Sequence, residues 1–254
     1  MTHPIRDKPD ETELWFVDLQ DSAAALDAIE RQTPRLASDD LRKISNSTTA
    51  AAAAERRAAY IALRVLIERN WGPSWRGIAY TLEGSGKPAL KGLPGSFSLT
   101  HVEHYALIAL THAGSIGVDL ETDRRPTIAD ARRARIESAA IVLARGAPLP
   151  EPAQRRFLQA WVRLEAIAKA DGKGIGRLLT RLGLVGADPV SGPLFNSDDA
   201  NEIAAQFWVH DVAVGGGCVA AVARDQPLNP LSARTLPTTA QGLEDLTTNC
   251  SPAD

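Results

Sequence analysis

Gly117-Val118-Asp119-Leu120-Glu121 is the stretch of sequence around which this chain is organised. Apolar runs at 105–110 and from 115 onward predict a hairpin of two β-strands, the second of which ends in this stretch. Because side chains alternate along a strand, Asp119 and Glu121 are expected on one face and the apolar residues between them on the other. Two carboxylates on one face repel each other unless a cation lies between them. The alternative is a solvated strand end with two acids, because an Asp-x-Glu triplet alone is a weak signal.

A second acidic residue pattern lies downstream, on a predicted helix. Trp161, Glu165 and Lys169 fall at positions i, i+4 and i+8 of a segment, 154–170, that contains no Gly or Pro. They therefore share one helical face. The helix should end in the Gly-rich turn 171–176, whose backbone could approach a ligand closely. The alternative is an ordinary surface ion pair between Glu165 and Lys169, which would stabilise the helix by about 0.2–0.5 kcal/mol. That alternative does not explain why a Trp lies on the same face or why the Gly-rich turn follows.

Four sequence blocks, taken in order, resemble the Sfp-type 4'-phosphopantetheinyl transferase family, and together they span roughly residues 55 to 176. Four ordered motifs are more specific than any one of them. The blocks are Gly86-Lys87-Pro88, Phe97-Ser98-Leu99-Thr100-His101, Gly117 to Glu121, and Trp161-Val162-Arg163-Leu164-Glu165-Ala166 with Lys169. Two positions depart from the family pattern. Thr100 stands where Ser is usual and keeps the hydroxyl, whereas Leu164 stands where Lys is usual and removes a positive charge.

The resemblance implies an α/β (α+β) fold of two pseudo-symmetric halves, each a small antiparallel sheet packed by a long helix. Residues 1–114 would form the nucleotide- and phosphate-binding half, and residues 115–226 the half with the metal and the catalytic carboxylates. The apolar run 218–223 is similar in pattern to 105–110, as two related halves would require. Members with two halves are usually monomers, so a monomer is expected.

The resemblance also implies an enzyme, a holo-[acyl-carrier-protein] synthase. Such enzymes transfer the 4'-phosphopantetheine arm of coenzyme A to a Ser of an apo acyl or peptidyl carrier protein and release adenosine 3',5'-bisphosphate. Magnesium, which prefers one or two carboxylates together with phosphate oxygens, is the implied cofactor. The implied metal ligands are Asp119, Glu121 and Glu165, and the implied catalytic residues are Glu165, Asp119 and Lys169. The implied coenzyme A contacts are Arg56, Arg57, Lys87, Pro88, Thr100, His101 and Lys169, with Arg57 on the ribose phosphate and Glu165 activating the acceptor Ser.

The same residues are compatible with two alternative functions. One is a different magnesium-dependent phosphoryl transferase or hydrolase, which would turn over without a carrier protein. The other is a non-catalytic coenzyme A-binding or scaffolding module, which would be expected to have lost its carboxylates.

The remaining elements follow from apolar periodicity and turn residues. A buried strand is predicted near the N-terminus and a strand hairpin near residue 215, while the tail from Pro227 is rich in Pro, Thr and small polar residues and is predicted to be disordered. The predicted strands are 14–19, 76–82, 96–100, 207–212 and 218–223. The predicted helices are one capped by Asp21-Ser22 and ended by Pro34, one at 38–44, one at 48–68 and one at 128–136, with Lys87 on a loop between 83 and 88.

The composition is that of an ordinary globular protein, with 254 residues, 44% of them hydrophobic and 23% charged. A net charge of −3 argues against a nucleic-acid binder but allows a local basic patch. No run of 18 apolar residues predicts a membrane span, and the polar N-terminus lacks a signal-peptide core, so a cytoplasmic protein is expected. Cys218 and Cys250 lie in dissimilar surroundings and are not expected to pair.

Overall fold

The computed structural model describes residues 12–83, 86–122, 129–151, 153–185 and 194–248. Over these residues the protein is mixed α/β, with eight α-helices and three small sheets, which confirms the predicted α/β class. The specific arrangement of two pseudo-symmetric halves stays a prediction.

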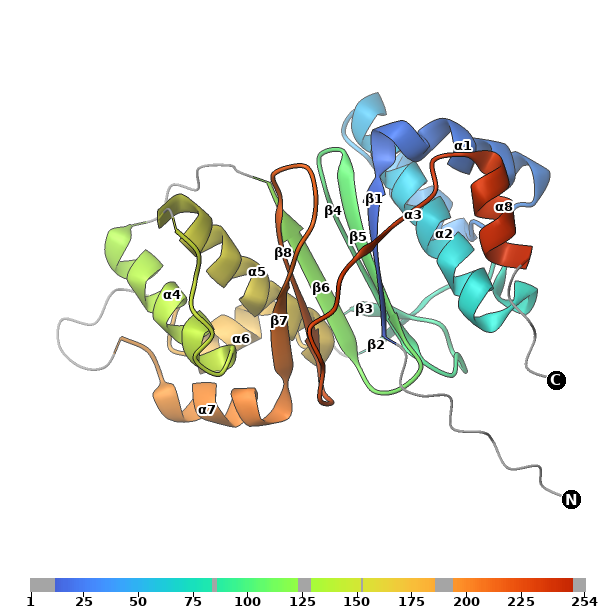
Figure 1. Ribbon diagram of the computed structural model, residues 1–254. Helices are drawn as coiled ribbons and strands as arrows, with labels where there is room; N and C mark the ends of the chain where they lie inside the picture. Colours follow the sequence, from blue (N-terminus) through green and yellow to red (C-terminus); the bar gives the residue numbers. More distant parts are fainter. Residues whose placement is uncertain (1–11, 84–85, 123–128, 152, 186–193, 249–254) are drawn as a thin grey trace, which may run out of the picture.

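Two sheets occupy the middle of the molecule, and helices lie outside them on both sides (Figure 1). The first sheet has the order β4-β5-β1-β9, and the second has the order β6-β8-β7. Side chains from both sheets, including Leu14, Leu107, Val118 and Val222, form one shared apolar cluster. The strands are β1 (Glu13–Asp18), β4 (Ser96–Val102), β5 (Tyr105–Thr111), β6 (Ile116–Glu121), β7 (Trp208–Val212), β8 (Val219–Arg224) and β9 (Arg234–Thr235).

The helices cover the outer faces of the sheets and complete two further cores. Beside the first sheet, α1 (Leu19–Gln32), α3 (Ala50–Trp71) and α8 (Ala240–Thr248) pack in its core, and α2 (Ser38–Ser45) lies against α3. Helices of the second sheet are α4 (Asp130–Leu143), α5 (Ala153–Asp171), α6 (Ile175–Arg181) and α7 (Ser197–Gln206). A short 3-10 helix, η1 (Pro73–Trp75), follows α3, and β2 (Thr81–Glu83) pairs with β3 (Lys87–Ala89) as a separate two-stranded sheet.

The predicted hairpin between 105–110 and 115–121 is wrong in its pairing. Both strands exist, but β5 is hydrogen-bonded to β4 on one edge and to β1 on the other. With both edges of β5 occupied, β6 cannot join it and instead pairs antiparallel with β8, so that Asp119 lies opposite Ala221. The chain therefore passes from the first sheet to the second at the turn around Gly114.

Several smaller boundaries also differ from the predictions. Helix α1 starts earlier than expected, because Asp18 rather than Asp21-Ser22 caps it through bonds from the amides of Gln20 and Asp21. The predicted strand 76–82 is reduced to β2, and Lys87 lies on strand β3 rather than on a loop. Helix α4 extends to Leu143, well beyond the predicted end at 136. The hairpin of β7 and β8 is confirmed.

The predicted disorder of the tail from Pro227 is wrong for residues up to 248. Strand β9 pairs parallel with β1, and α8 packs in the same apolar core as α1 and α3. Leu236 and Leu243 anchor this segment with 1% and 0% of their surface exposed. Two deeply buried leucines in a polar stretch are too sparse a pattern to reveal a docking segment. Residues 249–254 lie outside the described residues.

We expect Leu243→Ala to lower the free energy of unfolding by about 2–5 kcal/mol, because it empties a fully buried site between α8 and the first sheet's helices. Asp245→Ala, two residues away on the same helix and exposed, should change it by less than about 0.5 kcal/mol. Urea denaturation of both variants measures the difference. Equal stability of Leu243→Ala and Asp245→Ala would show that α8 contributes nothing to the fold.

Gly117 sets the distance between β6 and α5. A Cβ at this position would lie less than 3 Å from the backbone of Ala166, Lys169 and Ala170. Only glycine therefore lets the helix backbone approach the strand this closely.

Gly117→Ala should therefore destabilise the protein by about 1–3 kcal/mol or more, since strand and helix must move apart. The matched control is Gly176→Ala on α6, where an added Cβ meets nothing within 4 Å and where alanine should raise helix stability by up to about 1 kcal/mol. Thermal unfolding of the two variants tests this. A Gly117→Ala protein as stable as wild type would contradict the close contact.

Candidate functional site

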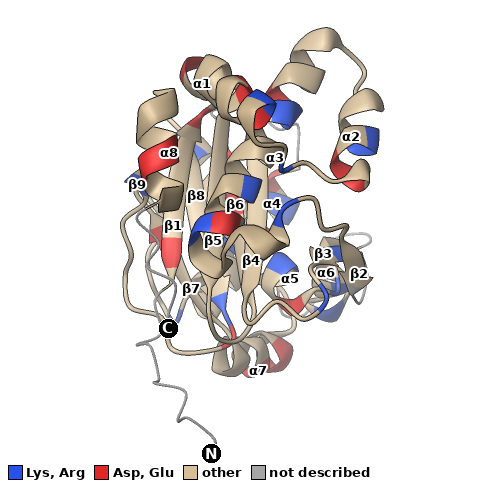
Figure 2. Ribbon diagram, turned by 90° about the vertical axis from the view of Figure 1, so that its right-hand side faces the viewer, with Lys and Arg blue, Asp and Glu red and all other residues tan. Residues whose placement is uncertain are grey.

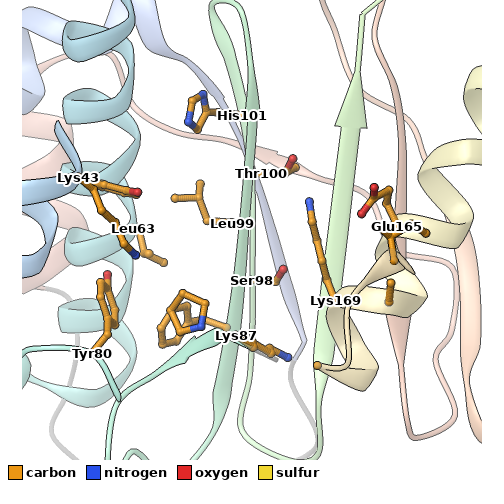
Figure 3. A pocket seen from close by; sticks show the side chains of 18 residues that line it. Lys43, Leu63, Tyr80, Lys87, Ser98, Leu99, Thr100, His101, Glu165 and Lys169 are labelled. Atoms are coloured by element: carbon orange, nitrogen blue, oxygen red, sulfur yellow. The ribbon is translucent and has the colours of Figure 1, made fainter. Parts of the chain in front are cut away.

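A cavity of about 500 Å³ brings together most of the residues that the sequence singled out. One wall comes from α3, β3 and β4, and the opposite wall from the C-terminal part of α5 and the start of α6 (Figure 3). Six predicted site residues line it: Lys87, Pro88, Thr100, His101, Glu165 and Lys169. Residues from separate sequence motifs thus come together at a single place in the fold.

Asp119 joins the two sheets and α5 behind the cavity. Its Oδ1 accepts a hydrogen bond from the Thr100 hydroxyl at 3.1 Å and lies 2.7 Å from the Lys169 ammonium. Only 6% of Asp119 is exposed, so these are largely desolvated contacts. Thr100 makes this bond with its hydroxyl, a group that Ser also carries.

Glu165 lies one helical turn before Lys169 on α5 and faces the same cavity. Its burial raises the pKa of the carboxyl group, and the negative charges of Asp119 and Glu121 raise it further, while Lys169 lowers it. The three carboxylates therefore repel one another, and Glu121, like Asp119, is buried.

These carboxylates fit Mg²⁺ in charge and in ligand type, because the ion prefers carboxylate oxygens and would relieve their repulsion. Within the described residues, however, no three His, Cys, Asp or Glu side chains are already arranged around a common point suited to a metal. Asp119, Glu121 and Glu165 would have to come together around the ion.

No known protein-family model matches the chain, and no curated protein matches it either. No helix in the described parts of the chain is both long and apolar enough to cross a membrane.

His101 lines the cavity from β4, next to Thr100. Burial lowers the pKa of its imidazole, and the nearby positive charges of Arg56 and Lys169 lower it further, against an opposite effect of Glu55. His101 was expected to neutralise phosphate charge. With a lowered pKa it is mostly uncharged at neutral pH and can instead donate a neutral N–H hydrogen bond.

Lys87 and Pro88 lie on β3 at the boundary between the sheets. The Lys87 ammonium donates to the carbonyl of Ile116 at 2.8 Å, and its aliphatic chain lies beside Gly172 of the Gly-rich turn. A strand places Lys87 more firmly than the predicted loop would.

Arg57 is not among the residues that line the cavity. Its guanidinium forms an ion pair with Asp27 of α1 at 2.8 Å. Arg56 is bonded to the carbonyl of Lys43 and the hydroxyl of Ser47, and it approaches the site closely enough to affect the pKa of His101. Neither arginine lines the cavity, and of the two only Arg56 acts on the pKa of His101.

Sequence reasoning missed three residues of the cavity wall, Lys43, Tyr60 and Tyr80. The scarcity of lysine was a usable signal, since Lys43 is one of only six in the chain. Trp161 and Leu164 belong to the core of the second sheet's helices instead: Trp161 stacks with Phe157, and Leu164 is fully buried.

In metal-free buffer with a chelator, Glu165→Gln should be more stable than wild type at neutral pH. Because the folded-state pKa of Glu165 is raised, ionisation opposes folding; this penalty is absent below about pH 4.5 and grows as pH rises through the folded pKa. Urea denaturation between pH 4.5 and 7.5 should show the two proteins diverging in that direction. A Glu165→Gln protein that is less stable at pH 7.5 would contradict the shift.

Proposed function

We propose that this protein is a magnesium-dependent transferase of the Sfp type, which moves the 4'-phosphopantetheine arm of coenzyme A to a Ser of an apo carrier protein. The observation that carries the proposal is the contact of Asp119 with both Lys169 and Thr100 beside the cavity that Glu165 and Lys87 line. Residues from four separate sequence blocks meet there.

Asp119, Glu121 and Glu165 would hold Mg²⁺ together with oxygens of the pyrophosphate. When bound, the ion withdraws charge from the phosphate groups and so stabilises the leaving group. Lys169 and Lys87 supply further positive charge, and His101 donates a hydrogen bond from its neutral ring.

Glu165 is the residue best suited to take the proton of the acceptor Ser. It lies on the cavity wall one turn before Lys169, where its carboxylate can face an incoming hydroxyl group. The Ser oxygen then forms a bond to the phosphorus that carries pantetheine, and the bond from that phosphorus to the bridging oxygen breaks. Adenosine 3',5'-bisphosphate leaves with the electron pair of that bond.

The test is intact-protein mass spectrometry of an apo carrier protein incubated with coenzyme A, Mg²⁺ and this protein. We expect the carrier to gain the mass of one phosphopantetheine group, and a chelator to abolish the gain. Consumption of coenzyme A without modified carrier would point to a hydrolase. Binding of coenzyme A without any turnover would point to a scaffolding module.

Glu165→Gln separates the two roles of this side chain. If Glu165 takes the Ser proton, kcat should fall by at least about 10²-fold and excess Mg²⁺ or Mn²⁺ should not restore it, because an amide cannot accept that proton. The KM for coenzyme A should change little. Recovery of most of the rate at high metal concentration would leave Glu165 as a ligand only.

Lys87→Ala provides the contrasting result. It removes a charge that would act on bound coenzyme A throughout the reaction, so its main effect should be a raised KM, at about 1.5–3 kcal/mol for a charged hydrogen bond. Lys91→Ala, an exposed lysine outside this cavity, is the matched control and should leave KM unchanged. A large fall in kcat for Lys87→Ala at saturating coenzyme A would contradict a purely binding role.

A further inference from the structure

The short helix α2 contributes to the cavity wall, although little apolar surface attaches it to the protein. Asp40 is the only buried residue of its eight, and Leu41 is half exposed. Figure 2 shows α2 at the margin of the molecule, beside α3. A helix of this length is not stable alone in water, so polar contacts must account for its position: the buried contacts of Asp40, and a bond from Arg56 to the Lys43 carbonyl at 3.0 Å.

Asp40 makes its contacts through one carboxylate oxygen. Its Oδ2 accepts hydrogen bonds from the amide of Ala37 at 2.9 Å and from Nε of Arg64 at 2.9 Å, and lies 2.7 Å from the Arg64 Nη2. The two side chains are 0% and 1% exposed. This is therefore a fully buried ion pair between α2 and α3.

Arg64 extends the connection to a third segment. Its Nη1 donates to the carbonyl of Ile78 at 2.8 Å, and its guanidinium lies 4.2 Å from the centre of the Tyr80 ring. One ion pair thus links α2, α3 and the segment leading into β2.

Each of these three segments supplies a side chain to the cavity. They are Lys43 from α2, Tyr60 from α3 and Tyr80 from the segment before β2. The Lys43 ammonium lies 5.9 Å and 5.4 Å from the ring centres of Tyr60 and Tyr80, across the cavity from Lys169 (Figure 3). Burial raises the pKa of both phenols, so both rings stay neutral beside the cation.

We propose that the Asp40–Arg64 pair is a positioning device that sets Lys43 and Tyr80 for binding the anionic nucleotide portion of the ligand. The lysines Lys43, Lys87 and Lys169 line the cavity against a single lining carboxylate, which favours a ligand with several phosphate groups. The pair lies away from Glu165 and acts on affinity, not on the chemical step. The kinetic part of this inference rests on the proposed transferase function.

The first experiment measures the position of Lys43 directly and needs no activity. Lysines of the ligand-free protein are acetylated with acetic anhydride, and the rate at Lys43 is measured by peptide mass spectrometry relative to exposed Lys91. Asp40→Asn should raise the Lys43 rate several-fold, because α2 is released. Arg64→Lys, which keeps the charge but loses the forked contacts, should raise it in the same direction.

The matched control is Glu13→Gln on β1. Glu13 is also buried and forms an ion pair with Arg69 of α3 at 2.5 Å, and neither residue lines the cavity. Its substitution should lower stability but leave the Lys43 rate within the range of wild type. An unchanged rate in both Asp40→Asn and Arg64→Lys, or an equal rise in Glu13→Gln, would overturn the proposal.

The second experiment measures KM and kcat for coenzyme A. Asp40→Asn should raise KM by about 10- to 100-fold with kcat retained, as expected for a displaced binding group. Lys43→Met should have a similar effect, and the double variant should be no worse than the more severe single one, because both changes remove the same contact. Fully additive effects would overturn the proposal. If the wild-type protein neither binds coenzyme A nor modifies a carrier, the proposed function fails, while the labelling rates still decide whether Asp40 positions Lys43.

Discussion

The contact between β6 and α5 at Gly117 is the constraint on which the site depends. Without a Cβ at this position, the backbone of α5 lies directly against the strand, and Lys169 comes within 2.7 Å of Asp119. On the same face, α5 is also held by Arg163, which is 1% exposed and binds both carboxylate oxygens of Asp211 on β7 at 2.7 Å. The helix that carries Glu165 and Lys169 is thereby fixed against two strands of one sheet, so it has little freedom to slide or rotate.

Charge is separated across the site, and this separation explains why neighbouring groups have pKa values shifted in opposite directions. Carboxylates gather where β6 meets α5, and their repulsion together with burial raises the pKa of Glu165. Toward β4, burial and nearby cations lower the pKa of His101. Both shifts favour the neutral form of a buried group, yet the charges around each group have opposite signs. An anionic ligand that binds together with a cation would match both regions, because the cation would lie beside the carboxylates and the anion beside the positive charges.

Local patterns in the sequence predicted the residues of the site better than their surroundings. Alternation along β6 and the i, i+4 spacing on α5 fixed which faces carry Asp119, Glu165 and Lys169, because these follow from backbone geometry alone. The partner of β6 is β8, about a hundred residues further along, and nothing local specifies that pairing. The same limit applies to Arg57, whose direction is set by Asp27 on another helix, and to α8, whose place is set by the surface it covers.

The cavity wall exists because β4 and β6, the edge strands of their two sheets, meet without forming a backbone ladder. Their link is made by side chains instead: the Ser98 hydroxyl accepts the amide hydrogen of Val118 at 3.1 Å, and Thr100 donates to Asp119. A continuous ladder would have drawn the strands together and consumed these hydroxyls. These side-chain hydrogen bonds satisfy polar groups of the edge strands where the sheets touch, such as the amide of Val118, and they leave room beside β4 for a ligand. Each sheet with its helices therefore supplies a different part of the candidate site: Thr100 and His101 come from the first, Asp119, Glu165 and Lys169 come from the second, and neither part could form the site alone.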